Sequence, residues 1–204
     1  MTNIKLKIVR SCNVGFIVAL ATAFSPLCSY AQSGGVSVNY EAKGNLAITH
    51  KLACMSLSDM KTDYTPADIY PAFADCVSKE RYDDATQLFM LAGAYAKFDT
   101  LRVTDQTAHE ASTVLVIESL ANIDEAKKLA WSENISRFAE GDEKQHAEIC
   151  AHIQHVGAPT YYPGYMIQHG MNAFSPAPPA PLVESFNASK AWETTLTAYL
   201  QCAA

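Results

Sequence analysis

Three side chains on one predicted helix have the types and the spacing of metal ligands. Glu148, His152 and His155 stand at positions i, i+4 and i+7 of the segment 142–156, which places them close to one stripe of a helix. Imidazole nitrogens and carboxylate oxygens are common ligands of Zn²⁺. The segment has no HExxH motif, so a fourth ligand would have to come from a distant residue such as His169. We favour the alternative of a solvated polar face without a metal, and we expect no cofactor.

Histidine-based catalysis is a second chemical hypothesis. His109 is followed by Glu110, but adjacent residues on a helix point about 100° apart and do not pair with each other. The chain has no GxSxG elbow, P-loop or dinucleotide-binding fingerprint. An envelope hydrolase or a metal-dependent enzyme is therefore only an alternative, and it would require several histidines to converge in one cleft. The candidates are His109, His146, His152, His155 and His169.

The first 31 residues have the features of a secretory signal peptide. A basic start is followed by an apolar run over 14–24, and Ser29 and Ala31 are the small residues of a cleavage site. The run is shorter than the roughly 20 residues of a membrane span. We therefore expect a periplasmic or secreted protein without stable membrane insertion. Lipidation at Cys28 and a retained leader are the alternatives.

The cysteines that remain after this leader indicate covalent cross-links rather than catalysis. An even number of cysteines in an exported protein favours disulfides, and four cysteines allow three pairings. We favour Cys54 with Cys76 and Cys150 with Cys202, because each pair joins segments that we expect to be neighbours. Each bridge should contribute about 2–4 kcal/mol to stability.

The charge balance argues against nucleic acid as a partner. The 204 residues carry a net charge of −6, and the predicted leader holds three of the 15 basic residues and none of the 21 acidic ones. Its removal would bring the net charge to −9. A strongly acidic protein is repelled by phosphate backbones. A basic protein is the more natural partner.

Helical periodicity over most of the chain predicts an all-α fold. We expect a flexible leader over 32–44 and one helical domain over 45–204, built as a compact antiparallel bundle or a helical-hairpin array and stapled by two disulfides. Thr65 and Asp68 have the spacing of a capping box, and a Pro-rich connector at 175–181 should be stiff. A buried strand competes with the helix at 113–117. The predicted helices cover residues 45–57, 65–78, 82–97, 104–123, 124–141, 142–156 and 183–201.

One helical hairpin resembles a tetratricopeptide repeat. Tyr82, Ala85, Phe89 and Ala92 have the spacing of the second helix of that repeat, and the letters RYDDA resemble its turn. The resemblance covers residues 65–98, and no second copy follows about 34 residues later. It implies a helical hairpin and, if it extends further, an assembly scaffold.

The segment before the connector is the predicted partner-binding region. Tyr161, Tyr162, Tyr165 and Met166 lie among Gly and Pro residues with little charge, a composition typical of amphipathic binding surfaces. The alternative is that these side chains cover the core. Without a catalytic motif, we expect an exported non-catalytic protein that acts through protein–protein binding. One specific hypothesis is an inhibitor or immunity-type protein of the bacterial envelope.

Overall fold

The computed structural model describes residues 41–139 and 143–203. These residues belong to one compact unit, and the predicted signal peptide and most of the predicted leader lie outside the described ranges. Within those ranges all the regular secondary structure is helical, apart from one isolated antiparallel bridge between Val103 and Leu182. The prediction of an all-α fold is therefore confirmed.

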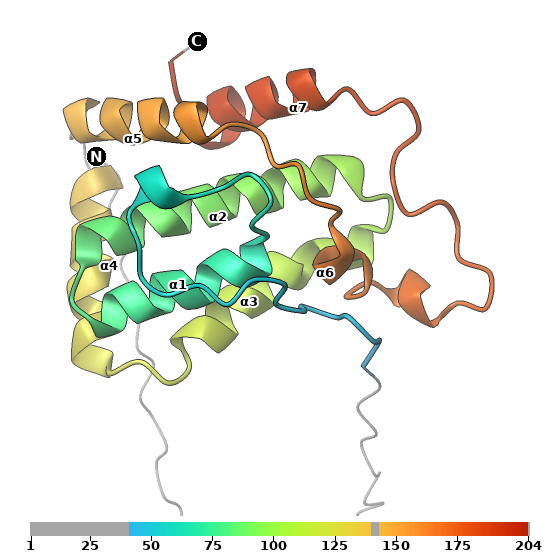
Figure 1. The fold of residues 1–204 in the computed structure, drawn as a ribbon, viewed down its shortest axis with the longest axis horizontal. Coiled ribbons are helices and arrows are strands. Elements are labelled where there is room, and N and C mark those ends of the chain that lie inside the picture. The colour runs from blue at the N-terminus through green and yellow to red at the C-terminus, as the bar shows by residue number, and fades with distance from the viewer. Residues whose placement is uncertain (1–40, 140–142, 204) are drawn as a thin grey trace, which may run out of the picture. The chain divides into compact units, whose positions relative to one another are not determined.

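The helices are arranged around α2, which runs from Tyr82 to Arg102 (Figure 1). Helices α5 and α7 lie on one side of α2, α1 and α3 lie on the other side, and α4 stands at one end (Figure 1). The remaining elements are η1 Leu57–Asp59, α1 Pro66–Ser78, η2 Gln106–Glu110, α3 Ala111–Leu120, α4 Glu125–Ala139, α5 Glu143–Val156, α6 Gly164–Ile167, η3 Met171–Phe174, α7 Ala188–Thr194 and η4 Thr195–Tyr199.

The core is concentrated where α1, α2 and α4 meet. Phe73 of α1 is fully buried, and its ring centroid lies 4.8 Å from that of Trp131 of α4 and 5.4 Å from that of Phe89 of α2. Small residues such as Ala85 and Ala92 let α1 approach α2 closely, because they add little side-chain volume at the contact. The helical hairpin expected from the sequence is thus present, although the contribution of Trp131 was not predicted.

The capping box predicted at the start of α1 is present and has a second role. The Thr65 side chain accepts a hydrogen bond from the amide of Asp68, and the Asp68 carboxylate accepts one from the amide of Thr65. The same buried carboxylate accepts the amides of Thr49 and His50 at 2.6 and 2.7 Å. Asp68 therefore caps its own helix and also holds the segment that precedes it.

The prediction of a helix over residues 45–57 is wrong. This segment consists of turns and extended backbone, with positive φ angles of 94° at Gly44 and 48° at Leu46. Besides local turn bonds, some of its amides bond to other elements: the Leu46 amide donates to the Tyr165 carbonyl, and the Cys54 amide donates to the Asp75 carboxylate at 2.7 Å. Tertiary partners thus replace the intrahelical bonds that the apolar spacing suggested.

The last predicted helix, residues 183–201, is shorter than expected. Regular helix begins only at Ala188, capped by the Asn187 side chain, and it changes to a π-helical turn at Thr195. The first residues of the predicted span are not helical: the Val183 amide donates to the Arg102 carbonyl, and residues 184 and 185 form a turn. The backbone of residues 182–183 is therefore committed to the end of α2.

Two disulfides tie irregular segments to helices, in the pairing favoured from the sequence. Cys54 pairs with Cys76 of α1, and Cys150 of α5 pairs with Cys202 near the C-terminus, with Cα–Cα distances of 4.7 and 5.6 Å. Each bridge therefore cross-links a segment with few backbone bonds of its own.

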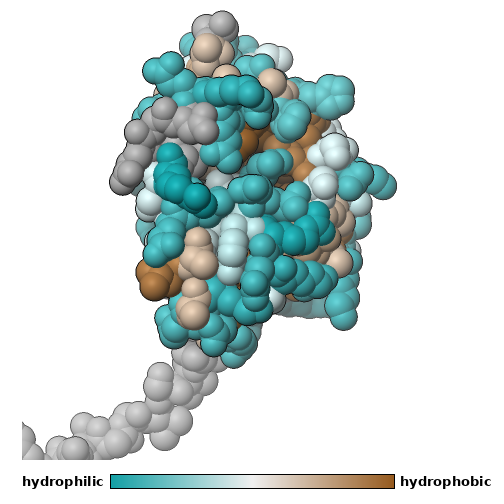
Figure 2. All heavy atoms as spheres, turned by 90° about the vertical axis from the view of Figure 1, so that its left-hand side faces the viewer, coloured by the Kyte–Doolittle hydropathy of each residue, from teal (hydrophilic) through white to brown (hydrophobic). Residues whose placement is uncertain are grey.

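The surface on the side of α4 is polar. The face seen in Figure 2, on the side of α4, is covered mainly by hydrophilic residues. In the part of the chain that the structure describes, no helix combines the length and the apolar character needed to cross a membrane.

Replacement of Asp68 by Asn should destabilise the protein by about 2–4 kcal/mol, because the amides that donate to this buried carboxylate lose a charged acceptor. Burial raises the pKa of Asp68, but the hydrogen bonds from His50, Thr65 and Thr49 outweigh it, and the pKa lies below its ordinary value of 3.8. The carboxylate therefore contributes stability above pH 3.8, and this contribution is lost as the pH falls further. Urea unfolding at pH 7 and near pH 3 measures both effects.

The control for this experiment is Asp63→Asn, which changes an exposed aspartate. It should alter stability by no more than about 0.5 kcal/mol. Equal effects of the two substitutions at pH 7 would contradict the role of Asp68.

Candidate functional site

A buried carboxylate at the end of α2 organises the predicted aromatic segment. Asp99 is fully buried, and its Oδ2 accepts hydrogen bonds from the hydroxyls of Tyr161 and Tyr165 at 2.9 and 2.8 Å. The Arg102 Nε donates to Oδ1 at 2.8 Å. One aspartate thus joins α2 to the chain that follows α5.

Arg102 completes this cluster through its charge and its flat face. Its guanidinium carbon lies 5.0 Å from the ring centroid of Phe98 and 5.1 Å from that of Tyr161, a range in which cation–π attraction operates. Its Nη2 lies 2.6 Å from Asp99 Oδ1 as an ion pair, but without the geometry of a hydrogen bond. The buried charge of Asp99 is therefore balanced locally.

Burial controls the protonation of the cluster. It raises the pKa of Asp99 to about 6, although Arg102 and the two tyrosine hydroxyls act in the opposite direction. Burial and the nearby Asp99 charge raise the pKa of both Tyr161 and Tyr165 well above the ordinary value. The two phenols therefore stay protonated and remain hydrogen-bond donors.

The structure does not present the four predicted partner-binding residues on one surface. Tyr165 and Met166 are 3% and 0% exposed, and Tyr161 is half-buried with its hydroxyl on Asp99. Only Tyr162 is exposed, at 60%. For the other three residues the structure favours the alternative considered from the sequence, in which they cover the core.

Tyr162 instead belongs to a different apolar surface. It lines a pocket of about 210 Å³ together with Asn172 and Ala173 of η3 and with Pro178 and Pro179 of the connector. The same short helix carries two exposed apolar side chains, Met171 at 66% and Phe174 at 48%. Met171 and Phe174 are not part of the pocket lining, but they belong to the helix that contributes Asn172 and Ala173 to it. We use the name Tyr162 surface for Tyr162, Met171, Phe174, Pro178 and Pro179.

The backbone beneath the Tyr162 surface is fixed by polar contacts. The Thr104 amide donates to the Pro181 carbonyl at 3.0 Å, and the Asn172 amide donates to the Asp105 carboxylate at 2.8 Å. Gly170 lies so close to η2 that an added Cβ would come within 2.8 Å of the Asp105 Cγ and 2.9 Å of the Ala108 Cβ. A residue without a side chain is needed there for η3 to approach.

Sequence reasoning missed Met171 and Phe174, although one signal was available. Both flank the Pro-rich connector, where the chain has little regular structure to bury apolar side chains. Their exposure follows from the tertiary position of η3, which the apolar spacing alone does not specify.

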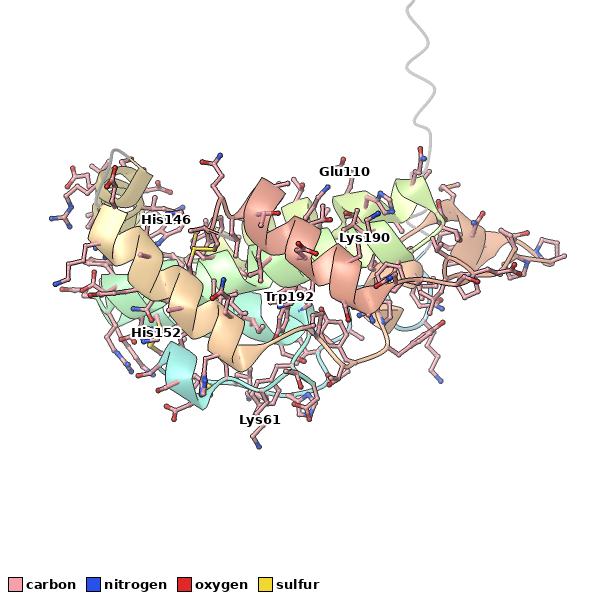
Figure 3. The ribbon with its side chains drawn as sticks, turned by 90° about the horizontal axis from the view of Figure 1, so that it is seen from above. Lys61, Glu110, His146, His152, Lys190 and Trp192 are labelled. Atoms are coloured by element: carbon pink, nitrogen blue, oxygen red, sulfur yellow. A yellow bond between two sulfur atoms is a disulfide. The ribbon has the colours of Figure 1, made fainter. Side chains whose placement is uncertain are left out.

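The candidate histidines have different surroundings. His109 Nε2 lies 3.0 Å from the Val103 carbonyl oxygen, and His169 Nδ1 lies 2.8 Å from the Asn45 side-chain oxygen. Figure 3 shows His146 and His152 on different sides of α5. The convergence required by the hydrolase hypothesis is therefore not seen for these residues.

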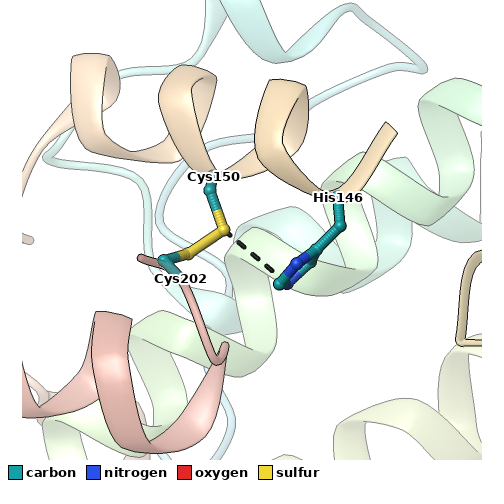
Figure 4. Close-up of side chains that lie close together, drawn as sticks. All are labelled: His146, Cys150 and Cys202. Atoms are coloured by element: carbon teal, nitrogen blue, oxygen red, sulfur yellow. Dashed lines mark hydrogen bonds between the residues drawn. A yellow bond between two sulfur atoms is a disulfide. The ribbon is translucent and has the colours of Figure 1, made fainter. Parts of the chain in front are cut away.

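The predicted trio Glu148, His152 and His155 is exposed on α5. Glu148 forms an ion pair with Lys144 at 3.8 Å. Among the described residues, groups of three His, Cys or carboxylate side chains come within metal-binding range at one place only, and that place does not include this trio. It consists of His146, Cys150 and Cys202 (Figure 4).

Comparison with known proteins gives no further guidance to the site. The chain matches no protein-family model, no curated protein and no solved structure at a significant level. The site is therefore interpreted from its own geometry.

The contribution of Asp99 to stability should decrease as the pH rises from 3.8 to about 6. Between these values the folded protein keeps a proton that the unfolded chain has released, so rising pH favours the unfolded state. Replacement of Asp99 by Asn should remove this dependence. Urea unfolding of both proteins at several pH values between 4 and 7, taken as the difference between them, measures it.

Tyr165→Phe provides a second test of the same cluster. It removes a hydrogen bond that favours the ionised carboxylate, so the pH range over which stability changes should move upward. A wild-type protein whose stability advantage over Asp99→Asn stays constant, or grows, with rising pH would contradict the buried-carboxylate interpretation.

Proposed function

We propose that the protein acts by binding another protein through the Tyr162 surface, without catalysis of its own. The observation that carries the proposal is the exposure of Tyr162 in the lining of a pocket with proline walls, together with the exposure of Met171 and Phe174 on the short helix that contributes to the same lining. Exposed apolar side chains that occur singly need no explanation, whereas groups of them mark interaction sites. Aromatic and Met side chains are also enriched in protein interfaces.

The support beneath these residues favours binding with little reorganisation. The Asp99 cluster fixes the chain on both sides of Tyr162, and the bonds from Thr104 and Asn172 fix the connector and η3. A surface that is already ordered loses less conformational entropy when a partner binds. This rigidity distinguishes the Tyr162 surface from a loose loop with exposed apolar residues.

The compartment and charge give the proposal a narrower form. We infer an exported protein, because two disulfides are typical of an oxidising compartment. The net charge of −9 expected after leader removal favours a basic partner, whose approach would be accelerated by opposite charge. An inhibitor or immunity-type protein that covers a basic enzyme of the bacterial envelope fits both features.

Photo-crosslinking from the surface itself tests the proposal. A benzophenone side chain placed at position 162 or 174 of the full chain should form one specific protein adduct in the envelope of the producing cell. The same probe at position 129, where Leu129 of α4 is 62% exposed on another element, should not form that adduct. Adducts that are equal at all three positions would contradict the proposed surface.

The partner recovered in this way then allows a quantitative test. Tyr162→Ser and Phe174→Ser should each weaken its binding by about 10-fold or more, because interface aromatics are often the residues that dominate affinity. Leu129→Ser should leave binding unchanged. All three variants should keep the wild-type melting temperature within a few degrees, because the substituted side chains are exposed. A loss of affinity that occurs only in unfolded variants would refute the proposal.

A further inference from the structure

The Cys150–Cys202 disulfide has an imidazole beside it. His146 and Cys150 are four residues apart on α5 and therefore lie on the same face, which is turned toward the C-terminal segment that carries Cys202 (Figure 4). One donor atom of each residue lies within 4.8 Å of the other two. Both cysteines are buried and His146 is half-buried.

The spacing of two of these atoms already matches a metal site. His146 Nε2 lies 3.7 Å from Cys150 Sγ. In a tetrahedral zinc site with Zn–S of about 2.3 Å and Zn–N of about 2.0 Å, the two ligand atoms are roughly 3.5 Å apart. For the ion to bind, the Cys202 sulfur, now bonded to Cys150 Sγ, would have to move away by rotation of its side chain, and His146 Nε2 would have to leave the Leu200 carbonyl oxygen.

We propose that His146, Cys150 and Cys202 form a Zn²⁺ site when the disulfide between the two cysteines is reduced. A dithiol reductant supplies the two electrons: it becomes a cyclic disulfide, the Cys150–Cys202 bond breaks, and each sulfur is left as a thiol. The two thiols release their protons as they bind the ion, because the thiolate is the ligand. A water molecule occupies the fourth position.

Backbone contacts keep the third ligand close after reduction. The Cys202 amide donates to the Leu196 carbonyl at 2.9 Å, independently of the disulfide. His146 Nε2 lies 2.8 Å from the Leu200 carbonyl oxygen, and this contact is exchanged for the metal when Nε2 coordinates. Metal binding thus replaces one cross-link between α5 and the C-terminus with another.

The second disulfide provides an internal contrast. Cys54 and Cys76 lie near Asp75, whose Oδ2 accepts the Cys54 amide and the Lys79 side chain. Within the described residues, this pair is not part of any three-donor group. Reduction of the whole protein should therefore create one metal site and not two.

Cobalt binding to the full chain tests the proposal, because Co²⁺ reports tetrahedral thiolate coordination by its absorption spectrum. The protein is reduced with dithiothreitol, desalted without oxygen and titrated with Co²⁺ and then with Zn²⁺. We expect one Co²⁺ per chain with thiolate charge-transfer bands, displacement by Zn²⁺, and a melting temperature that Zn²⁺ raises for the reduced protein. The oxidised protein should show none of these signals.

Two variants assign the site. Cys150→Ser with Cys202→Ser should abolish the spectrum while keeping the thiols of Cys54 and Cys76. His146→Gln should keep both thiols of the site and weaken the affinity by at least about 10–100-fold, because it removes a direct ligand and the loss of a group that only supports a ligand already costs that much. Helical circular dichroism of the reduced variants verifies that they are folded, and the His146 variant decides the test if the double variant is not.

Three outcomes would overturn the proposal. The first is no Co²⁺ binding by the reduced wild type. The second is an unchanged spectrum in the folded double variant, which would assign the metal to Cys54 and Cys76. The third is an unchanged affinity and spectrum in His146→Gln.

Discussion

The Asp99 carboxylate is the interaction on which the candidate binding surface depends. It lies at full burial near the end of α2, and it receives two phenol hydroxyls from a segment more than sixty residues away in sequence. A buried charge is costly unless it is paired and hydrogen-bonded. The partners of Asp99 are therefore held in place by the cost of leaving it unpaired, and the exposed position of Tyr162 follows from the buried positions of its neighbours.

The same device recurs at three other places in the chain. Asp68 holds the amides of Thr49 and His50, Asp75 holds the amide of Cys54, and Asp105 holds the amide of Asn172. In each case a carboxylate on or beside a helix accepts donors from irregular backbone or, for Asn172, from a single short 3₁₀ turn. Hydrogen bonds with a charged acceptor are stronger than neutral ones. Carboxylates therefore accept hydrogen bonds from the amides of these segments, as backbone carbonyls do within a helix.

The molecule therefore consists of a helical core and of segments that are attached to it by these carboxylates and by the two disulfides. The aromatic contacts of Phe73, Phe89 and Trp131 hold α1, α2 and α4 together. The attached segments depend instead on hydrogen bonds and disulfides. A surface formed by such attached segments can expose apolar side chains without weakening the core, because hydrogen bonds and disulfides fix its backbone. The Tyr162 surface has this character, and so does the C-terminal segment that the Cys150–Cys202 bridge attaches to α5.

Local signals in the sequence determined the helical class, the capped start of α1 and the helical hairpin, and the even set of cysteines indicated disulfides while it left three pairings open. These features depend on residues close in sequence, or on a strong chemical constraint such as an even set of cysteines. Tertiary structure alone decided the course of residues 45–57, whose apolar spacing suggests a helix until Asp75 and Tyr165 provide partners for their backbone. It also decided which aromatic side chain would face solvent, since Tyr161, Tyr162 and Tyr165 are alike in type, but Tyr161 and Tyr165 donate to the buried Asp99 carboxylate whereas Tyr162 lines a surface pocket. Which tyrosine is exposed depends on contacts between distant parts of the chain, and the residues next to each tyrosine in sequence do not specify it.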